Sequence, residues 1–212
     1  MLKVGGYVQV RYLGRDSDDV AYSGVVVDAT RSRATIELVN TSQPVLADHC
    51  EIRAKAGADV HCYSCRVLVA HEGGTGRGLK LSVEVLRESL DVYVREVFRH
   101  TVPDGVLTAT FGADPRCRVV AISPHGIGLL CGAAHEVGSQ ELVELRRDAD
   151  AWRGVAEVRY VRPPTAHGIH HGLLVPPGET ALRRGLGELS AWIERLNLQA
   201  AARVRDRLFE PG

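Results

Sequence analysis

The chain reads Arg95-Glu-Val-Phe-Arg99 and, further on, Ala121-Ile-Ser-Pro-His-Gly-Ile-Gly-Leu129. The first stretch places two arginines four residues apart just before a segment of β-type sequence. The second is a turn with one hydroxyl and two glycines, flanked by the apolar pairs Val119-Val120 and Leu129-Leu130. Guanidinium groups form bidentate contacts with phosphate and can stack on a flat base. Two arginines that precede a glycine turn at a strand edge therefore predict an anion or nucleotide site.

The composition is that of an ordinary globular protein. Its 212 residues suffice for two small domains of about 100 residues each. Lys and Arg together number 26 and so do Asp and Glu, so we expect neither a nucleic acid polymer nor a membrane surface as partner. No apolar run approaches the roughly 18 residues needed to insert into a membrane, and the N-terminus does not resemble a signal peptide. The odd count of five cysteines favours a reducing, cytoplasmic location.

The first half of the chain has the pattern of short β-strands. From Tyr7 to Tyr12, apolar residues alternate with polar ones, which predicts a half-buried strand. Five more strands are expected at residues 23–29, 35–39, 50–54, 60–70 and 79–83, separated by polar or glycine-rich turns. Six short strands predict a small antiparallel barrel or split barrel. Residues 84–93 lack a clear β period, and we expect a linker there, with a helical turn.

The second half repeats this style and then changes period. Strands are expected at residues 106–111, 116–122, 126–131, 142–147, 155–162 and 168–175. Apolar residues then recur every three or four positions from Leu182 to Val204, which predicts an amphipathic helix over 181–208. Its apolar stripe can pack on its own domain or pair with a second copy in a homodimer. The fold class is thus mainly β, with two small antiparallel β-barrels and a C-terminal α-helix.

Several other patterns have competing interpretations. Cys62-x-x-Cys65 has a spacing used by zinc and redox sites, but positions three apart on a strand face opposite sides. Residues 72–78 share only their glycines with a phosphate loop and fit a hairpin. His167, His170 and His171 cluster, yet the adjacent pair would face apart, and we expect exposed or partly buried side chains. No catalytic motif appears. We therefore expect no catalytic residue, no metal site and no cofactor.

The order of the two opening stretches resembles the signature of the PilZ domain, a bacterial receptor for cyclic di-GMP. That signature is Arg-x-x-x-Arg followed by Asp/Asn-x-Ser-x-x-Gly, and it is matched by Arg95, Arg99, Ser123 and Gly126. A β-barrel before the arginines resembles the two-domain, YcgR-like subgroup. The resemblance implies an N-terminal YcgR-N-like split barrel at 1–90 and a PilZ barrel with its helix at 91–212. It also implies that the arginines hold phosphate and guanine, while Ser123 lies at the base edge.

Two positions depart from the family pattern. Ala121 stands where the family has an Asp or Asn that hydrogen-bonds the guanine edge, and Val94 stands where many members carry another arginine. A missing hydrogen bond of this kind costs about 1–3 kcal/mol, or about 5- to 100-fold in affinity. Ala121 is therefore a degenerate position of the ligand site, and Val94 leaves open whether one or two ligands bind.

Three functions follow as hypotheses. The first is a non-enzymatic cytoplasmic receptor in which cyclic di-GMP changes the relation of the two barrels. Its protein target would belong to the flagellar or polysaccharide-synthesis machinery, so that it acts on motility or surface behaviour. The second is a degenerate PilZ protein that binds no nucleotide and acts as an interaction module through the helix. The third, an enzyme, would need a catalytic constellation that assembles only in three dimensions.

Overall fold

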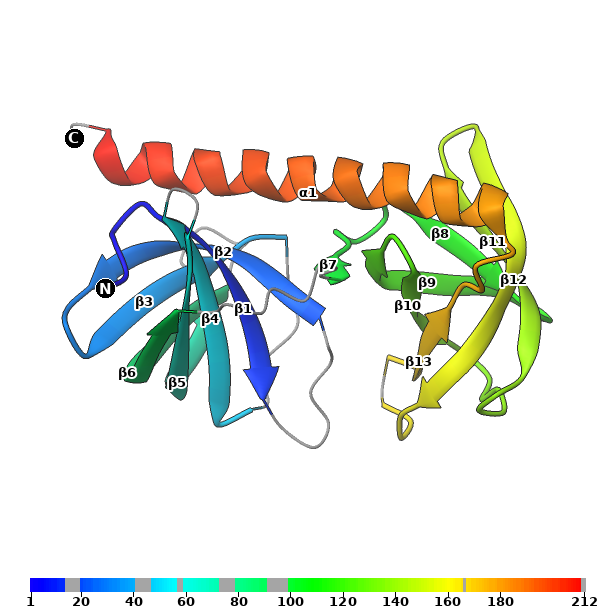
Figure 1. Cartoon of the computed structure of the whole chain (residues 1–212), viewed down its shortest axis with the longest axis horizontal. Coiled ribbons are helices and arrows are strands. Elements are labelled where there is room, and N and C mark those ends of the chain that lie inside the picture. The colour runs from blue at the N-terminus through cyan, green and yellow to red at the C-terminus, as the bar shows by residue number, and fades with distance from the viewer. Residues whose placement is uncertain are drawn as a thin grey trace. The chain divides into compact units, whose positions relative to one another are not determined.

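The first six strands pair into a closed antiparallel ring in the computed structural model, which describes residues 1–13, 20–40, 47–56, 59–72, 79–90, 99–165 and 167–210. The ring runs β1-β4-β5-β6-β3-β2, and β2 pairs with β1 again (Figure 1). This confirms the predicted six-stranded antiparallel barrel. The bounds are β1 (Tyr7–Leu13), β2 (Val20–Ala29), β3 (Arg33–Leu38), β4 (His49–Ala56), β5 (Asp59–Glu72) and β6 (Leu79–Leu90).

Alternating side chains of these strands fill the barrel. Val8 and Val10 of β1, Ile36 of β3, Ile52 of β4 and Leu81 of β6 are all buried in one apolar cluster. Each is separated from the next inward residue of its strand by one outward residue, as a half-buried strand requires. The period-2 pattern in the sequence therefore has its cause in this core.

The prediction of a linker from residue 84 onward was wrong for its first part, because β6 continues to Leu90. The segment lacks alternation because its outer end is exposed on both faces; Leu86, for example, is 54% exposed. What makes it a strand is backbone pairing with β5, in which Tyr63 lies opposite Glu88. Residues 91–93 lie outside the described residues.

Seven further strands form the second unit: β7 (Arg99–Thr101), β8 (Thr108–Phe111), β9 (Asp114–Ser123), β10 (Gly126–Cys131), β11 (Gln140–Arg147), β12 (Asp150–Val161) and β13 (Ile169–Leu174). Their antiparallel pairing runs β9-β10-β13-β12-β11-β8, and β8 also pairs with β9. The short strand β7 pairs with β9 and was not predicted. A three-residue strand is too short to show a period.

One helix ends the fold, as predicted. Helix α1 spans Thr180–Phe209, and no helix in the described part of the chain combines the length and the apolar character needed to cross a membrane. Contacts divide the chain into Met1–Phe98 with Glu194–Gly212 and, separately, Arg99–Ile193. The helix thus contributes residues to both units. The domain boundaries at 1–90 and 91–212 stay a prediction.

The apolar stripe of α1 is covered by the chain itself. In the second unit Leu182, Leu186, Leu189 and Ile193 are fully buried. In the first unit Ala201 and Val204 form a cluster with Val25 and Val39, and the Asn40 amide donates to Asn197 Oδ1 at 2.7 Å. A homodimer through this same stripe would have to uncover these residues.

Candidate functional site

Pairing of β7 with β9 carries Arg99 to the β9–β10 hairpin. His100 lies opposite Ile122 and Thr101 opposite Ala121, so Arg99 comes next to Ser123 at the end of β9. Residues two apart on a strand share a face. Arg99, Thr101, Ala121 and Ser123 therefore lie on one face of this sheet.

The guanidinium of Arg99 rests against Gly126. A Cβ atom at Gly126 would lie 3.1 Å from Arg99 Nη2 and 2.6 Å from the carbonyl oxygen of Leu173. The second distance is too short for any side chain, and the backbone of Leu173 cannot move away cheaply. Gly126 is not among the glycines with positive φ. Its role is close approach, which lets the arginine and the neighbouring strand reach the hairpin backbone.

The buried side chain of Ser123 stabilises the turn of the β9–β10 hairpin. Its hydroxyl donates to the Gly126 carbonyl at 3.3 Å, and the residue is buried. At the tip of the same turn, Arg183 Nη2 lies 2.7 Å from His125 Nδ1. The His125 carbonyl accepts a hydrogen bond from the Val175 backbone N–H at 3.0 Å. The hairpin is thus held by contacts on both sides.

Ala121 belongs to a row of residues that crosses the sheet. Gly128 pairs with both Ala121 and Gly172, and Gly172 pairs with Tyr160. A Cβ atom at Gly172 would collide with the ring of Tyr160, and one at Gly128 would lie 3.3 Å from His170 Nε2 and 3.2 Å from the Ala121 methyl. The two glycines make room for an aromatic ring and an imidazole, with the methyl of Ala121 at the other end.

The side chain of Tyr160 contacts two arginines, Arg99 and Arg162. Arg99 Nη1 donates to the Tyr160 hydroxyl at 3.2 Å, and its Cζ lies 6.0 Å from the ring centroid. Arg162 Cζ lies 5.5 Å from the same centroid. A ring with two guanidinium groups is a cation–π arrangement. Within the described residues Arg99 has no carboxylate partner, so its charge is not neutralised by an ion pair there.

The structure therefore brings together Arg99, Ala121, Ser123 and Gly126. Arg95 and Val94 lie outside the described residues. Tyr160, Arg162 and His170 were not predicted as site residues. Tyr160 lies opposite Gly172 of the next strand, and cross-strand neighbours of this kind interact; the sequence alone does not give this register.

The other sequence patterns have simple structural roles. Cys62 and Cys65 lie in β5 as expected, and both are buried. The exposed or partly buried state predicted for the histidines was wrong for two of them: His170 and His171 are buried, on opposite faces of β13. The ring centroids of His170 and Tyr160 lie 5.8 Å apart. Residues 73–78 of the glycine-rich segment lie outside the described residues.

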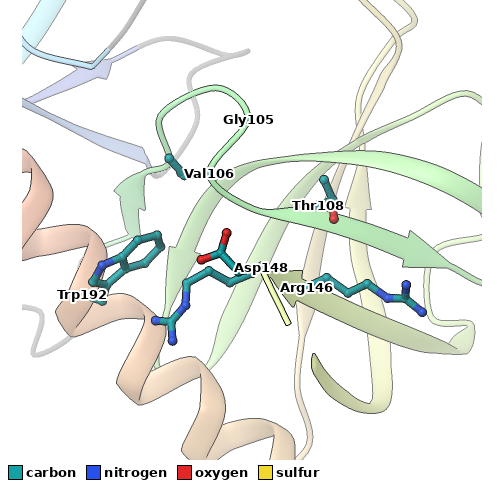
Figure 2. Close-up of a pocket in the computed structure, with 7 residues that line it drawn as sticks. Gly105, Val106, Thr108, Arg146, Asp148 and Trp192 are labelled. Atoms are coloured by element: carbon teal, nitrogen blue, oxygen red, sulfur yellow. The ribbon is translucent and has the colours of Figure 1, made fainter. Parts of the chain in front are cut away.

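A pocket of about 360 Å³ lies elsewhere in the second unit. Figure 2 shows Trp192 of α1 on one side, Asp148 and Arg146 on another, and Gly105, Val106 and Thr108 completing the wall. Arg147 Cζ lies 4.9 Å from the Trp192 ring centroid, but Arg147 is paired with Asp150 at 2.6 Å and Arg146 with Glu144. Both arginines of this pocket are thus in ion pairs with carboxylates. We therefore place the candidate site at Arg99 rather than in this pocket.

The fold defines a class of mainly β protein with a six-stranded antiparallel barrel, further paired strands and a C-terminal helix. No protein-family model matches the sequence, and a search of characterised proteins finds no match either.

Solved structures with a similar fold include YcgR of Escherichia coli in complex with c-di-GMP (16% identity, 93% of this chain and 88% of that chain, TM-score 0.43). They also include the Bacillus subtilis inhibitor of motility MotI/DgrA (14% identity, 93% of this chain and 99% of that chain, TM-score 0.39). A third is the complex of K. pneumonia MrkH with c-di-GMP (10% identity, 95% of this chain and 90% of that chain, TM-score 0.42). At these identities the likeness concerns the fold alone.

Proposed function

We propose that the chain is a non-enzymatic receptor for cyclic di-GMP whose ligand site is the face that carries Arg99, Ser123 and Gly126. The observation that carries the proposal is the contact of Arg99 with Gly126. These two residues belong to the two separate halves of the sequence signature, and a Cβ atom at Gly126 would lie only 3.1 Å from Arg99 Nη2. Arg95, the other arginine of the first half, is assigned to the same site from the sequence.

The chemistry of this face fits a nucleotide with phosphates and flat bases. Arg99 offers donors with no ion-pair partner in the described part of the chain, and guanidinium groups bind phosphate in a bidentate way. Tyr160 beside it supplies an aromatic face, on which bases stack for about 1–3 kcal/mol each. Ser123 would meet the base edge, although its own hydrogen bond to Gly126 must then be shared.

The rest of the proposal concerns the whole receptor. We interpret the closed pairing of β8 to β13 as the second, PilZ-type barrel. Ligand binding at the start of this unit would change its relation to the first barrel, in the way that ordering of a segment drives other switches. The output would reach a flagellar or polysaccharide-synthesis target in the cytoplasm.

Calorimetric titration of the purified protein with cyclic di-GMP tests the proposal. We expect measurable heat that is lost in Arg99→Ala and retained in Arg146→Ala, which removes an exposed arginine of the same unit that pairs with Glu144. Linear di-GMP and GTP serve as ligand controls.

Absence of heat and of competition at ligand concentrations near a millimolar would contradict the proposal. That result would leave the second hypothesis, in which a degenerate PilZ protein acts as an interaction module. Equal loss of binding in the Arg99 and Arg146 variants would place the ligand away from the hairpin.

A further inference from the structure

Three side chains with metal-ligand chemistry converge at one end of the second unit. Asp114 begins β9, Cys117 follows within that strand, and Cys131 ends the neighbouring strand β10. One ligand atom from each of them lies within 4.8 Å of the other two. We propose that Asp114, Cys117 and Cys131 bind a divalent cation of the zinc class, a site independent of the nucleotide site.

The strand register explains why the two thiols meet. Leu130 lies opposite Arg118 in the β9–β10 ladder. The next pair along the ladder is therefore Cys131 opposite Cys117. Both cysteines are buried, at 2% and 3% exposure, whereas Gly132 and Arg116 beside them are exposed. The two buried sulfur atoms thus lie next to exposed residues of the chain.

Two backbone N–H groups fix the orientation of the Asp114 carboxylate. Its Oδ2 accepts a hydrogen bond from the Gly132 backbone N–H at 2.6 Å, and its Oδ1 accepts one from the Arg116 N–H at 3.2 Å. Burial works to raise the pKa of Asp114, but the bonds from Gly132, Arg116 and Ala133 outweigh it and hold the pKa below its ordinary value. Hydrogen bonds that orient a ligand are typical of metal sites.

The spacing suits tetrahedral coordination with little movement. Zinc–sulfur bonds of about 2.3 Å place two thiolate sulfurs about 3.8 Å apart, and zinc–oxygen bonds are slightly shorter. The donor atoms here already lie within 4.8 Å of one another. A contraction of about 1 Å or less would therefore complete three bonds. Two thiolates and a carboxylate leave one position open, as in zinc sites that keep a water.

A partly buried imidazole lies in the same part of the second unit. The ring of His135 packs 4.5 Å from that of Phe111, which pairs with Asp114 in the β8–β9 hairpin. His135 Nδ1 is bonded to Glu141 Oε1 at 2.7 Å, while its buried Nε2 has no hydrogen-bond partner among the described residues. A histidine that ligates a metal often holds a carboxylate through its other nitrogen in this way, but His135 is not among the donor atoms that lie within 4.8 Å of one another here.

The chemistry of the thiols makes the binding measurable. A metal binds thiolates, and each Cys–metal bond that forms therefore releases a proton to the buffer. Metal binding should thus be accompanied by proton release.

The first unit offers a matched control. Cys50 and Cys65 are also buried, and they lie directly opposite each other on β4 and β5. In the part of the chain that the structure describes, no third donor groups with them. They share the thiol pair and the burial but not the carboxylate.

The test is titration of the reduced, chelator-treated protein with Co²⁺ and then with Zn²⁺. We expect thiolate-to-cobalt charge-transfer absorption with one equivalent of Co²⁺, its loss when Zn²⁺ displaces cobalt, and proton release in weakly buffered solution. Cys117→Ser and Cys131→Ser should abolish the absorption. Asp114→Asn should weaken binding about tenfold or more, and Cys50→Ser should leave it unchanged.

Absence of charge-transfer absorption in the wild type overturns the proposal. So does an absorption that survives in both Cys117→Ser and Cys131→Ser, or one that is lost in Cys50→Ser. If the cysteine variants fail to fold, Asp114→Asn decides, because this residue is partly exposed. An unchanged affinity in folded Asp114→Asn contradicts the assigned ligand set.

Discussion

Ala121 is the residue at which the proposed ligand site departs from the sequence signature. It is fully buried, and its methyl group faces Gly128 in the row that ends at Tyr160. The position shares a face with Arg99 and Ser123. A polar side chain here would therefore extend over the same face as the arginine that we assign to phosphate. In the proposed site, the methyl group at 121 offers the ligand no hydrogen bond.

We predict that Ala121→Asp strengthens binding of cyclic di-GMP by about 5- to 100-fold, the value of one recovered hydrogen bond. Ala121→Asn is the uncharged control variant. It offers a hydrogen bond without the desolvation free energy that burial of a carboxylate costs. Calorimetry gives the affinity, and thermal unfolding shows whether each variant is folded. Unchanged affinity in a folded variant would mean that this turn does not touch the ligand.

His171 is a buried residue whose charge state affects stability. Its Nε2 accepts a hydrogen bond from the His135 backbone N–H at 3.1 Å, and its Nδ1 bonds the Ile169 carbonyl at 3.0 Å. Both bonds suit the neutral ring, since a proton on Nε2 would face the His135 N–H. Burial lowers the pKa of His171 and outweighs the opposing hydrogen bond to the Ile169 carbonyl; the charges of His135 and His170 lower it further, and the charge of Asp114 raises it.

Because the folded pKa is lowered, protons bind the unfolded chain first. We predict that the free energy of unfolding falls as pH drops below about 6.5, the ordinary histidine value, by at most about 1.4 kcal/mol per pH unit. Urea unfolding at several pH values measures the slope. In His171→Asn the slope between about pH 6.5 and pH 5 should flatten. An identical slope in that variant would assign the effect to the other histidines.

At the scale of elements, helix α1 packs through a glycine on the second unit. A Cβ atom at Gly185 would collide with the indole of Trp152, whereas one at Gly187 would meet nothing within 4 Å. Both glycines lie inside the helix, two residues apart. The two positions therefore differ in what surrounds them, whereas the intrinsic cost of glycine in a helix is the same at both.

We predict opposite effects of alanine at these two positions. Gly187→Ala should stabilise the protein by about 0.5–1 kcal/mol, because alanine is the better helix former. Gly185→Ala should destabilise it by about 1–3 kcal/mol, because the Trp152 ring must move in a packed contact. Chemical unfolding of both variants gives the two changes. Equal stabilisation by both would show that the indole does not pack against Gly185.

The elements were largely predictable, and the exceptions have physical reasons. Strands that bury one face, such as β1, show their period in the sequence because Val8 and Val10 alternate with outward residues. Strand β7 and the end of β6 bury no continuous face, so only backbone pairing defines them. For the site, spacing predicted Arg99, Ser123 and Gly126. The contact of Tyr160 with Arg99 depends on strand register, which a single sequence does not contain.

At the scale of the whole molecule, the two units share two covalent connections. One is the segment before Arg99, and the other lies within α1, between Ile193 of the second unit and Glu194 of the first. In the proposed receptor, a ligand at Arg99 would act at the end of the first connection. Arg99 begins β7 and contacts Gly126 and Tyr160, so a ligand-driven change would start there.

We predict that cyclic di-GMP slows backbone hydrogen exchange in residues 91–99, the stretch that leads to Arg99, and leaves strands β4 and β5 unchanged. The physical reason is that a ligand gripped by Arg95 and Arg99 fixes the segment that carries them. Residues 91–98 of this stretch lie outside the described residues, so exchange is the direct measurement. Arg99→Ala, measured at the same ligand concentration, is the control and should show no slowing. A ligand that binds but changes exchange only around Ile193 and Glu194 would instead make the helix the route between the two units.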